Sequence, residues 1–142
     1  MDRDSLGIVV TEFNSDICET MLAVAQDEAA VLGVEITTVS HVPGAYEIPL
    51  IVDELLKHTD ITSVVVLGFI EKGETQHGEV MAHAVSSSLL VSSVKHQKAI
   101  GYGIIGPGAS LEQADHRREP YARAAVRAAV ASTQALRNIR KT

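Results

Sequence analysis

A chain of 142 residues, 46% of them hydrophobic, is close to the commonest domain size and predicts one compact domain over residues 1–142, because two domains of half this length would each be marginally stable. The formal net charge of −6 argues against a basic surface for nucleic acid, and the single cysteine excludes an intrachain disulfide framework. Neither a leader peptide nor an apolar run long enough to span a bilayer occurs, so we expect no membrane partner and a cytoplasmic location.

The first half of the chain reads as two strand–helix units. Residues 6–10 form an apolar run typical of a strand, and residues 15–33, rich in Ala, Leu, Met and Glu, are typical of a helix that ends at a glycine. Residues 34–39 alternate apolar and polar side chains, as a half-buried strand does. A Pro-Gly break then precedes a second predicted helix over residues 48–56.

The second half continues the same alternation. Residues 63–67 are apolar on both faces, which is typical of a central strand covered by helices on both sides, and a polar loop leads from them to a predicted helix over residues 77–96. A fourth strand is predicted over residues 99–105 and ends in a Gly-Pro-Gly turn. Two helices are predicted over residues 111–117 and 121–140, because a proline between them is well placed to start the second.

This order of elements predicts an α/β fold. Strands that alternate with helices form a parallel sheet with right-handed crossovers, so we expect a three-layer α/β/α sandwich with a flavodoxin-like, four-stranded parallel sheet flanked by helices. In such sheets ligands bind beyond the carboxyl ends of the strands. We therefore expect a site in the loops that follow the four strands.

Aromatic and polar residues follow the first two predicted strands. Phe13 is placed to stack on a flat heterocycle and Asn14 could hold a ligand amide, although both residues could equally serve only to make the turn. After the second strand, Gly44 allows a ligand close to the backbone and Glu47 offers a carboxylate to a polyhydroxyl group. Glu47 could equally be an acid that stabilises the start of the next helix.

The loop after the most apolar strand leads into a helix and carries Glu74, Thr75 and His77. Its backbone amides, the Thr75 hydroxyl and the helix start form an arrangement suited to an anion. The positive end of the helix dipole favours the neutral imidazole of His77, so this side chain could accept a proton at neutral pH. A purely structural histidine is the alternative.

Reactive and charged residues elsewhere give weaker indications. Arg117, with Arg118 and Arg123, could clamp a phosphate or could simply be solvated helix charges. Tyr102 lies between two glycines, but the remaining spacing of a dinucleotide fingerprint is missing. Cys18 has no base beside it in the sequence and the histidines show no metal-ligand spacing, so we expect neither thiol catalysis nor a metal.

The order and spacing of these residues resemble the lumazine synthase family. The resemblance covers nearly the whole chain and rests on Phe13-Asn14, Pro43 to Pro49, Leu67-Gly68, Gly73, Thr75, His77, Glu112 to Ala114 and Arg117. The Glu74-Thr75 pair and the Gly-Pro-Gly turn are most similar to archaeal members. The combination of motifs is specific to the family.

The resemblance implies a role for each site residue. His77 would be the catalytic residue and would transfer protons. Substrate contacts are implied for Phe13, Asn14, Gly44, Ala45, Tyr46, Glu47, Phe69, Ile70, Glu74, Thr75, Tyr102, Arg117 and Arg123. The pyrimidine ring of one substrate would stack on Phe13, its ribityl chain would bind at residues 44–47, and the phosphate of the second substrate would bind at residues 74–75. Of these residues, Tyr102, Arg117 and Arg123 would reach the site from a neighbouring subunit.

The reaction implied is the condensation of 5-amino-6-(D-ribitylamino)uracil with 3,4-dihydroxy-2-butanone 4-phosphate, which gives 6,7-dimethyl-8-ribityllumazine, phosphate and water in riboflavin biosynthesis. The resemblance implies a transferase that needs no cofactor and assembles as a homopentamer, or as a capsid-like shell of roughly 60 subunits. The alternatives are an archaeal-type riboflavin synthase, which consumes two lumazines, and a non-catalytic flavin-binding or shell-forming protein of the same fold.

Overall fold

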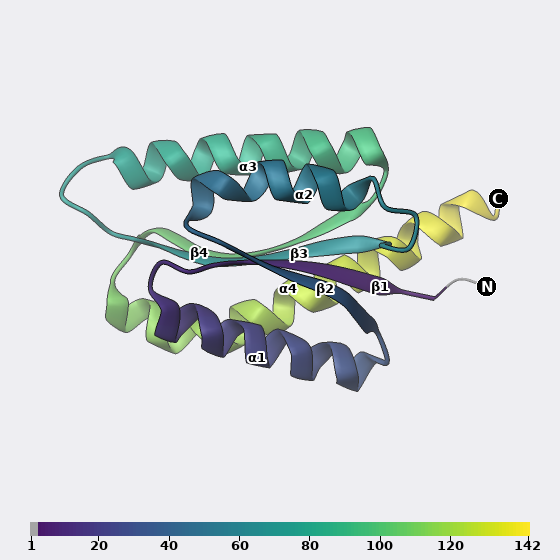
Figure 1. Cartoon of the computed structure of the whole chain (residues 1–142), viewed down its shortest axis with the longest axis horizontal. Coiled ribbons are helices and arrows are strands. Elements are labelled where there is room, and N and C mark those ends of the chain that lie inside the picture. The colour runs from purple at the N-terminus through teal and green to yellow at the C-terminus, as the bar shows by residue number, and fades with distance from the viewer. Residues whose placement is uncertain (1–2) are drawn as a thin grey trace.

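The computed structural model describes residues 3–142 as a parallel sheet between two layers of helices. Along this part of the chain the elements are β1 (Ser5–Thr11), α1 (Ser15–Leu32), β2 (Glu35–Val42), the one-turn 3-10 helix η1 (Ala45–Glu47), α2 (Ile48–Leu56), β3 (Ser63–Glu71), α3 (His77–His96), β4 (Ala99–Ala109) and α4 (Leu111–Arg140). The strands lie in the order β2-β1-β3-β4, and each neighbouring pair is parallel. Helices α2 and α3 cover one face and α1 and α4 the other, which confirms the predicted three-layer sandwich (Figure 1). Within residues 3–142, no helix is both long and apolar enough to cross a membrane.

The core is divided between the two faces of the sheet, because successive side chains of a strand point to opposite sides. In β3, Val65 and Leu67 pack in the cluster that includes α1 and α4, whereas Val64 and Val66 pack in the cluster that includes α2 and α3. All four side chains are fully buried, and β3 lies between β1 and β4. The prediction of a central strand covered on both faces is therefore confirmed.

Small residues set a short distance between α4 and the sheet. A Cβ atom added to Gly101 in β4 would lie 2.0 Å from the backbone oxygen of Ala125 in α4. Ala125 is buried, as are Ala122 and Ala129 one turn to either side of it. A helix with alanines on its inner face can approach a strand that carries glycine, so a chain with only 4% aromatic residues can still fill its core.

Most predicted boundaries are confirmed. Helices α2 and α3 have the predicted bounds, and α1 ends before Gly33, whose φ of 71° lies in the left-handed region that glycine adopts readily. All four strands run further than predicted, because their backbone hydrogen bonding continues past the apolar residues that mark them in the sequence. They are β1, β2, β3 and β4, which extend to Thr11, Val42, Glu71 and Ala109.

The C-terminal helix differs from the prediction. Residues 111–140 form one continuous helix with Pro120 inside it, so the prediction of two helices separated at the proline is wrong. A proline within a helix removes the hydrogen bond to the carbonyl four residues earlier, which here is that of His116. Pro120 and His116 are exposed, so water can satisfy this carbonyl. Buried Ala114 and Ala122 hold the two halves of the helix against the same layer, which keeps them continuous.

Candidate active site

A pocket of about 520 Å³ lies at the carboxyl ends of β1 and β3, where the segments that follow β1, β2 and β3 meet. It is lined by Thr11, Phe13, Pro43, Gly44, Ala45, Tyr46, Glu47, Phe69, Ile70, Glu71, Gly73, Thr75, His77, Gly78 and Met81. The loop after β4, which was also expected to contribute, is not part of this lining. Most of the site residues predicted from the sequence are therefore brought together at the expected edge of the sheet.

The turn after β1 is fastened to the loop after β2 by backbone hydrogen bonds. The amide of Glu12 donates to the carbonyl of Val42 at 2.8 Å, and the amide of Phe13 donates to the carbonyl of Pro43 at 3.2 Å. Phe13 is 66% exposed, so its ring is available to a flat ligand in the pocket. Asn14 follows in the left-handed conformation, and its buried Nδ2 has no hydrogen-bond partner among the described residues.

The loop after β2 presents a carboxylate next to exposed backbone. Gly44 is extended and accepts a hydrogen bond from the amide of Glu47 at 3.2 Å, which closes the short 3-10 helix. A Cβ added to Gly44 would lie 3.4 Å from Oε1 of Glu47, so the carboxylate lies against this glycine. Glu47 precedes α2, but its side chain makes no capping hydrogen bond to that helix. The carboxylate is therefore available to a ligand, and its charge also lies at the start of α2, as the alternative interpretation of Glu47 requires.

The third side of the pocket joins the end of β3 to the start of α3. Phe69 and Ile70 are each 4% exposed and form part of the pocket floor. His77 is the first residue of α3, and its amide donates to Oγ1 of Thr75 at 3.3 Å. A Cβ added to Gly78 would lie 3.1 Å from Cγ2 of Ile70, so this glycine lets the helix start approach the strand end closely. The imidazole thus lies at the positive end of the α3 dipole, on the pocket wall.

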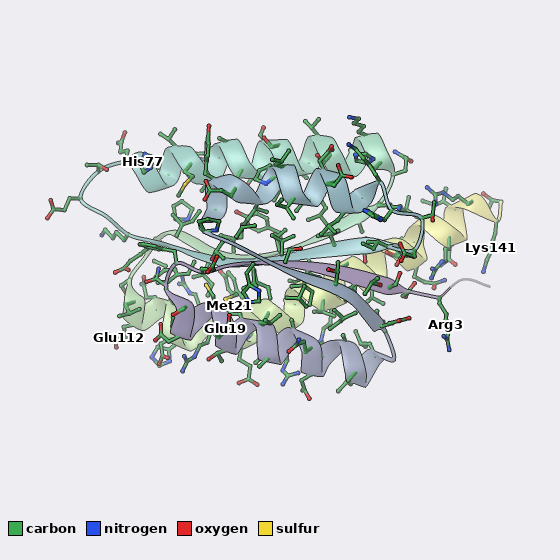
Figure 2. The ribbon with its side chains drawn as sticks, in the orientation of Figure 1. Arg3, Glu19, Met21, His77, Glu112 and Lys141 are labelled. Carbon is green, nitrogen blue, oxygen red and sulfur yellow. The ribbon has the colours of Figure 1, made fainter. Side chains whose placement is uncertain are left out.

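Five predicted site residues do not line the pocket. They are Asn14, Glu74, Tyr102, Arg117 and Arg123. Tyr102 lies within β4 and its hydroxyl accepts a hydrogen bond from Oγ of Ser86 in α3 at 3.1 Å. Arg117 is exposed near the start of α4. Figure 2 places His77 and Glu112, at the starts of α3 and α4, at one end of the molecule, with Arg3 and Lys141 at the other.

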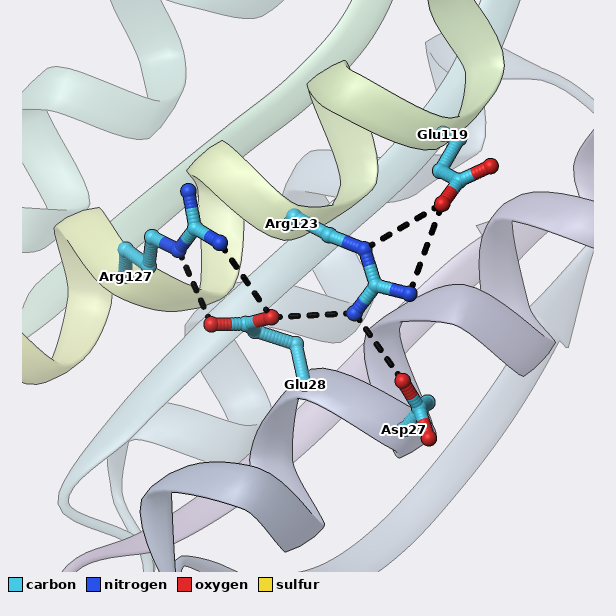
Figure 3. A network of polar contacts seen from close by, with 5 residues as sticks. All are labelled: Asp27, Glu28, Glu119, Arg123 and Arg127. Carbon is cyan, nitrogen blue, oxygen red and sulfur yellow. Dashed lines mark hydrogen bonds and ion pairs between the residues drawn. The ribbon is translucent and has the colours of Figure 1, made fainter.

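Arg123 belongs to a polar network between α1 and α4 (Figure 3). Its guanidinium contacts Glu28 at 3.0 Å, Asp27 at 3.0 Å and Glu119 at 3.5 Å. Glu28 is only 4% exposed and also pairs with Nε of Arg127 at 2.9 Å. The hydrogen bond from Arg127, followed by that from Arg123, lowers the pKa of the Glu28 carboxyl. Within one subunit, Arg123 therefore joins two helices and does not contact the pocket.

Several lining residues were missed by the sequence analysis. Thr11 and Glu71 lay beyond the ends of the predicted strands but were not named as site residues, and the structure makes them the last residues of β1 and β3. Met81 lies four residues after His77 on α3, so helical periodicity places it on the same face. Pro43, Gly73 and Gly78 complete the lining, and the first two belong to the motifs that carry the family resemblance but were not named as site residues.

Comparison with known proteins agrees with the geometry. Residues 4–137 match the model of the family described as 6,7-dimethyl-8-ribityllumazine synthase. A protein of that name from Staphylothermus marinus is 50% identical over 87% of this chain and 82% of its own length. Proteins of the same name from Aeropyrum pernix and Metallosphaera sedula are 45% and 46% identical, over 91% and 94% of this chain and 88% and 89% of their own lengths. With a family match over almost the whole chain and relatives this similar, the chain belongs to the 6,7-dimethyl-8-ribityllumazine synthase family.

Proposed function

We propose that this chain catalyses the reaction for which its family is named, the condensation of 5-amino-6-(D-ribitylamino)uracil with 3,4-dihydroxy-2-butanone 4-phosphate. The observation that carries the proposal is the convergence, in one pocket of about 520 Å³, of the exposed ring of Phe13, the carboxylate of Glu47 and the imidazole of His77. Each of these groups was ambiguous in the sequence alone. Their meeting at one edge of a parallel sheet favours a shared catalytic use.

The pyrimidine substrate fits the part of the pocket between the first two loops. Its ring stacks on the exposed face of Phe13, and the backbone of residues 69–70 contacts the ring edge. The ribityl hydroxyls hydrogen-bond to the backbone of residues 44–46 and to the carboxylate of Glu47, which makes no capping hydrogen bond to the adjoining helix.

The phosphate of the second substrate fits the segment that starts α3. Residues 74–75 supply backbone amides and a hydroxyl, and the positive end of a 20-residue helix favours the anion. Arg117 completes the phosphate site from a neighbouring subunit with a guanidinium suited to bidentate binding. Tyr102 would also approach from the neighbour, because in its own subunit it is exposed on β4 away from the pocket.

The chemistry needs proton transfer more than a strong nucleophile. The amine of the pyrimidine attacks the ketone and a first water leaves to form an imine. Phosphate is then eliminated, and the ribitylamino nitrogen attacks the remaining carbonyl and closes the ring with loss of a second water. His77 lies next to the proposed phosphate position and can move protons during these steps, which contributes about 10²–10⁴-fold. Holding two reactive substrates in register supplies the larger part of the acceleration. No cofactor takes part in this scheme.

A homopentamer is the assembly that we propose. Exposed apolar side chains on α2 and α3, which include Leu50, Leu90, Val91 and Val94, require a partner surface. A site shared between subunits makes association part of the mechanism, and a larger shell built from such pentamers is compatible with the same contacts. We place the enzyme in the cytoplasm, as one domain over residues 1–142.

The proposal is tested by incubating the purified protein with both substrates and following lumazine fluorescence and free phosphate together. We expect one phosphate for each lumazine formed. If the protein instead consumed lumazine to form riboflavin without any dependence on the butanone phosphate, an archaeal-type riboflavin synthase would be the better assignment. Binding of lumazine without turnover would favour a non-catalytic flavin-binding protein.

A further inference from the structure

One buried side chain outside the pocket lining contacts two residues of that lining. Sγ of Cys18, in the first turn of α1, lies 3.3 Å from the carbonyl oxygen of Phe13 and 3.3 Å from Oγ1 of Thr11. Cys18 is completely buried and Thr11 is 2% exposed. The thiol therefore lies directly beneath the turn that presents the Phe13 ring, between that turn and the end of β1.

The proton arrangement at this thiol is determined by the groups around it. A thiol has a single hydrogen, and the carbonyl of Phe13 can only accept, so the thiol donates to this carbonyl and the hydroxyl of Thr11 donates to the sulfur. Burial, with smaller effects from Asp16 and Glu19, raises the pKa of Cys18 despite opposing hydrogen bonds from Thr11 and the backbone of Phe69. The thiol thus stays protonated at neutral pH and keeps its role as a donor.

The Phe13 turn depends on few other contacts. The ring is 66% exposed, so packing does not fix its position. The backbone of Phe13 is held on one side by its amide, which donates to Pro43, and on the other by the thiol that donates to its carbonyl. The next residue, Asn14, adopts a left-handed conformation with φ of 58°, which asparagine tolerates better than most other side chains.

We propose that Cys18 is a positioning residue for the pyrimidine substrate, because its thiol holds the Phe13 backbone where the ring can stack. This inference rests on the proposed function, which assigns the ring of Phe13 to the pyrimidine. Cys18 itself does not touch the substrate. Its influence should therefore appear in binding of the stacked substrate and not in the binding of the phosphate-bearing one.

The test compares Cys18→Ala and Cys18→Ser with the wild-type enzyme in steady-state kinetics with both substrates. The alanine removes the donor and leaves the carbonyl of Phe13 without it, so we expect the KM for the pyrimidine to rise about three- to tenfold, as loss of one hydrogen bond predicts. The KM for the butanone phosphate should change less than about twofold. Serine restores a donor and an acceptor at the same place, so it should recover most of the lost affinity.

A matched control separates positioning from a general loss of stability. Thr133 is also buried and donates to a backbone carbonyl, that of Ala129 at 2.9 Å, but it lies in the second half of α4. Thr133→Ala should lower the melting temperature and leave both KM values unchanged. Affinity for the fluorescent lumazine product, measured by titration, provides a second readout and should fall in Cys18→Ala alone.

The outcomes are distinguishable from failure of the proposed function itself. If the wild-type protein formed no lumazine, this result would contradict both the proposed function and this inference. An active wild type, with a Cys18→Ala variant that raises both KM values equally or neither of them, would overturn only the inference. The positioning role would likewise be overturned if Thr133→Ala reproduced the effect, or if serine and alanine behaved alike.

Discussion

At the scale of single residues, the pocket combines groups that hold substrates with one group that can move protons. Phe13 and Glu47 come from the segments that follow β1 and β2, and His77 is the first residue of α3. Because each group belongs to a different segment, a substitution at one of them should alter one step and leave the others nearly intact.

We expect His77→Ala to lower kcat by about 10- to 1000-fold and to leave the KM for the pyrimidine nearly unchanged, because proton transfer is lost while stacking is kept. Steady-state rates across neutral pH measure both. The control is His83→Ala, since His83 lies on the same helix with its side chain 79% exposed and outside the pocket lining. A kcat equal to that of the wild type in His77→Ala would show that His77 has only a structural role.

Arg117→Ala should raise the KM for the butanone phosphate far more than the KM for the pyrimidine, because a guanidinium bound to phosphate anchors only one of the two substrates. The neighbouring Arg118 is the control, since it pairs with Asp115 at 2.8 Å in its own helix. Arg118→Ala should leave both constants close to those of the wild type. Equal increases of both KM values in the Arg117 variant would contradict a phosphate role.

The sequence was informative about these residues only where a local rule applied. The strand-end rule placed Phe13, Glu47 and His77 correctly at one edge, because that rule depends on topology and not on side-chain contacts. In the proposed shared site, Tyr102 and Arg117 come from a neighbouring subunit, and no local rule relates them to the pocket. Arg123 illustrates a further limit, since its three carboxylate partners are contributed partly by α1, almost a hundred residues away in the chain.

At the scale of elements, contact between α4 and β4 fixes the spacing of one half of the sandwich. A side chain at Gly101 would collide with the backbone oxygen of Ala125, and a helix backbone cannot yield as a flexible side chain does. We expect Gly101→Ala to lower the free energy of unfolding by about 2 kcal/mol or more, measured by urea denaturation. Gly7→Ala is the control, since its new methyl would meet side-chain ends and no backbone, the nearest being Cδ1 of Leu55 at 3.2 Å. Equal losses in the two variants would contradict this account.

The ion network between α1 and α4 should make stability depend on pH. The bound arginines hold the pKa of Glu28 below its ordinary value of 4.5, so folding favours the ionised carboxylate. This contribution is complete above that value and is lost as the pH falls through the lower pKa of the folded protein. We expect Glu28→Gln to lower the melting temperature by several degrees at neutral pH. The melting temperature of this variant should also fall less than that of the wild type as the pH is lowered.

Glu54→Gln is the matched control for that experiment. Glu54 pairs with Lys57 at 3.3 Å, but its side chain is 64% exposed, and exposed pairs contribute little to stability. Its melting curve should follow that of the wild type at each pH. If the melting temperature of Glu28→Gln followed that of the wild type at every pH, the network would contribute nothing to holding α1 and α4 together.

Helix α4 also shows why local signals were insufficient for one element. A proline commonly starts a helix, and position 120 fits that pattern, yet the helix continues through it. The cost is one hydrogen bond on the exposed face, whereas breaking the helix would remove buried alanines from the sheet. Burial of the second half of the helix depends on the whole fold, so it cannot be inferred from the residues around position 120.

At the scale of the whole molecule, a shared site predicts complementation between impaired variants. In oligomers assembled randomly from equal amounts of His77→Ala and Arg117→Ala chains, about a quarter of the sites combine an intact histidine with an intact neighbouring arginine. At butanone phosphate concentrations well below the KM of the Arg117 variant, co-refolded mixtures should therefore be more active than either variant alone, and light scattering should report a pentamer or a multiple of it. A wild-type monomer with full activity, or mixtures no more active than their components, would exclude a shared site.

Most residues that line the pocket differ from those that pack between the layers, and this separation affects how the sequence can change in evolution. Residues beyond the strand ends, such as Phe13 and Tyr46, are exposed and line the pocket, so their substitution changes substrate contacts without changing the helix–sheet spacing. Substitutions between the layers alter stability and leave the ligand untouched. Thr11, Ala45, Phe69 and Ile70 are exceptions, since all four are buried and all four line the pocket. Natural variation at these four positions has to satisfy selection on folding and on catalysis at once, so we expect them to be the slowest part of the pocket to change.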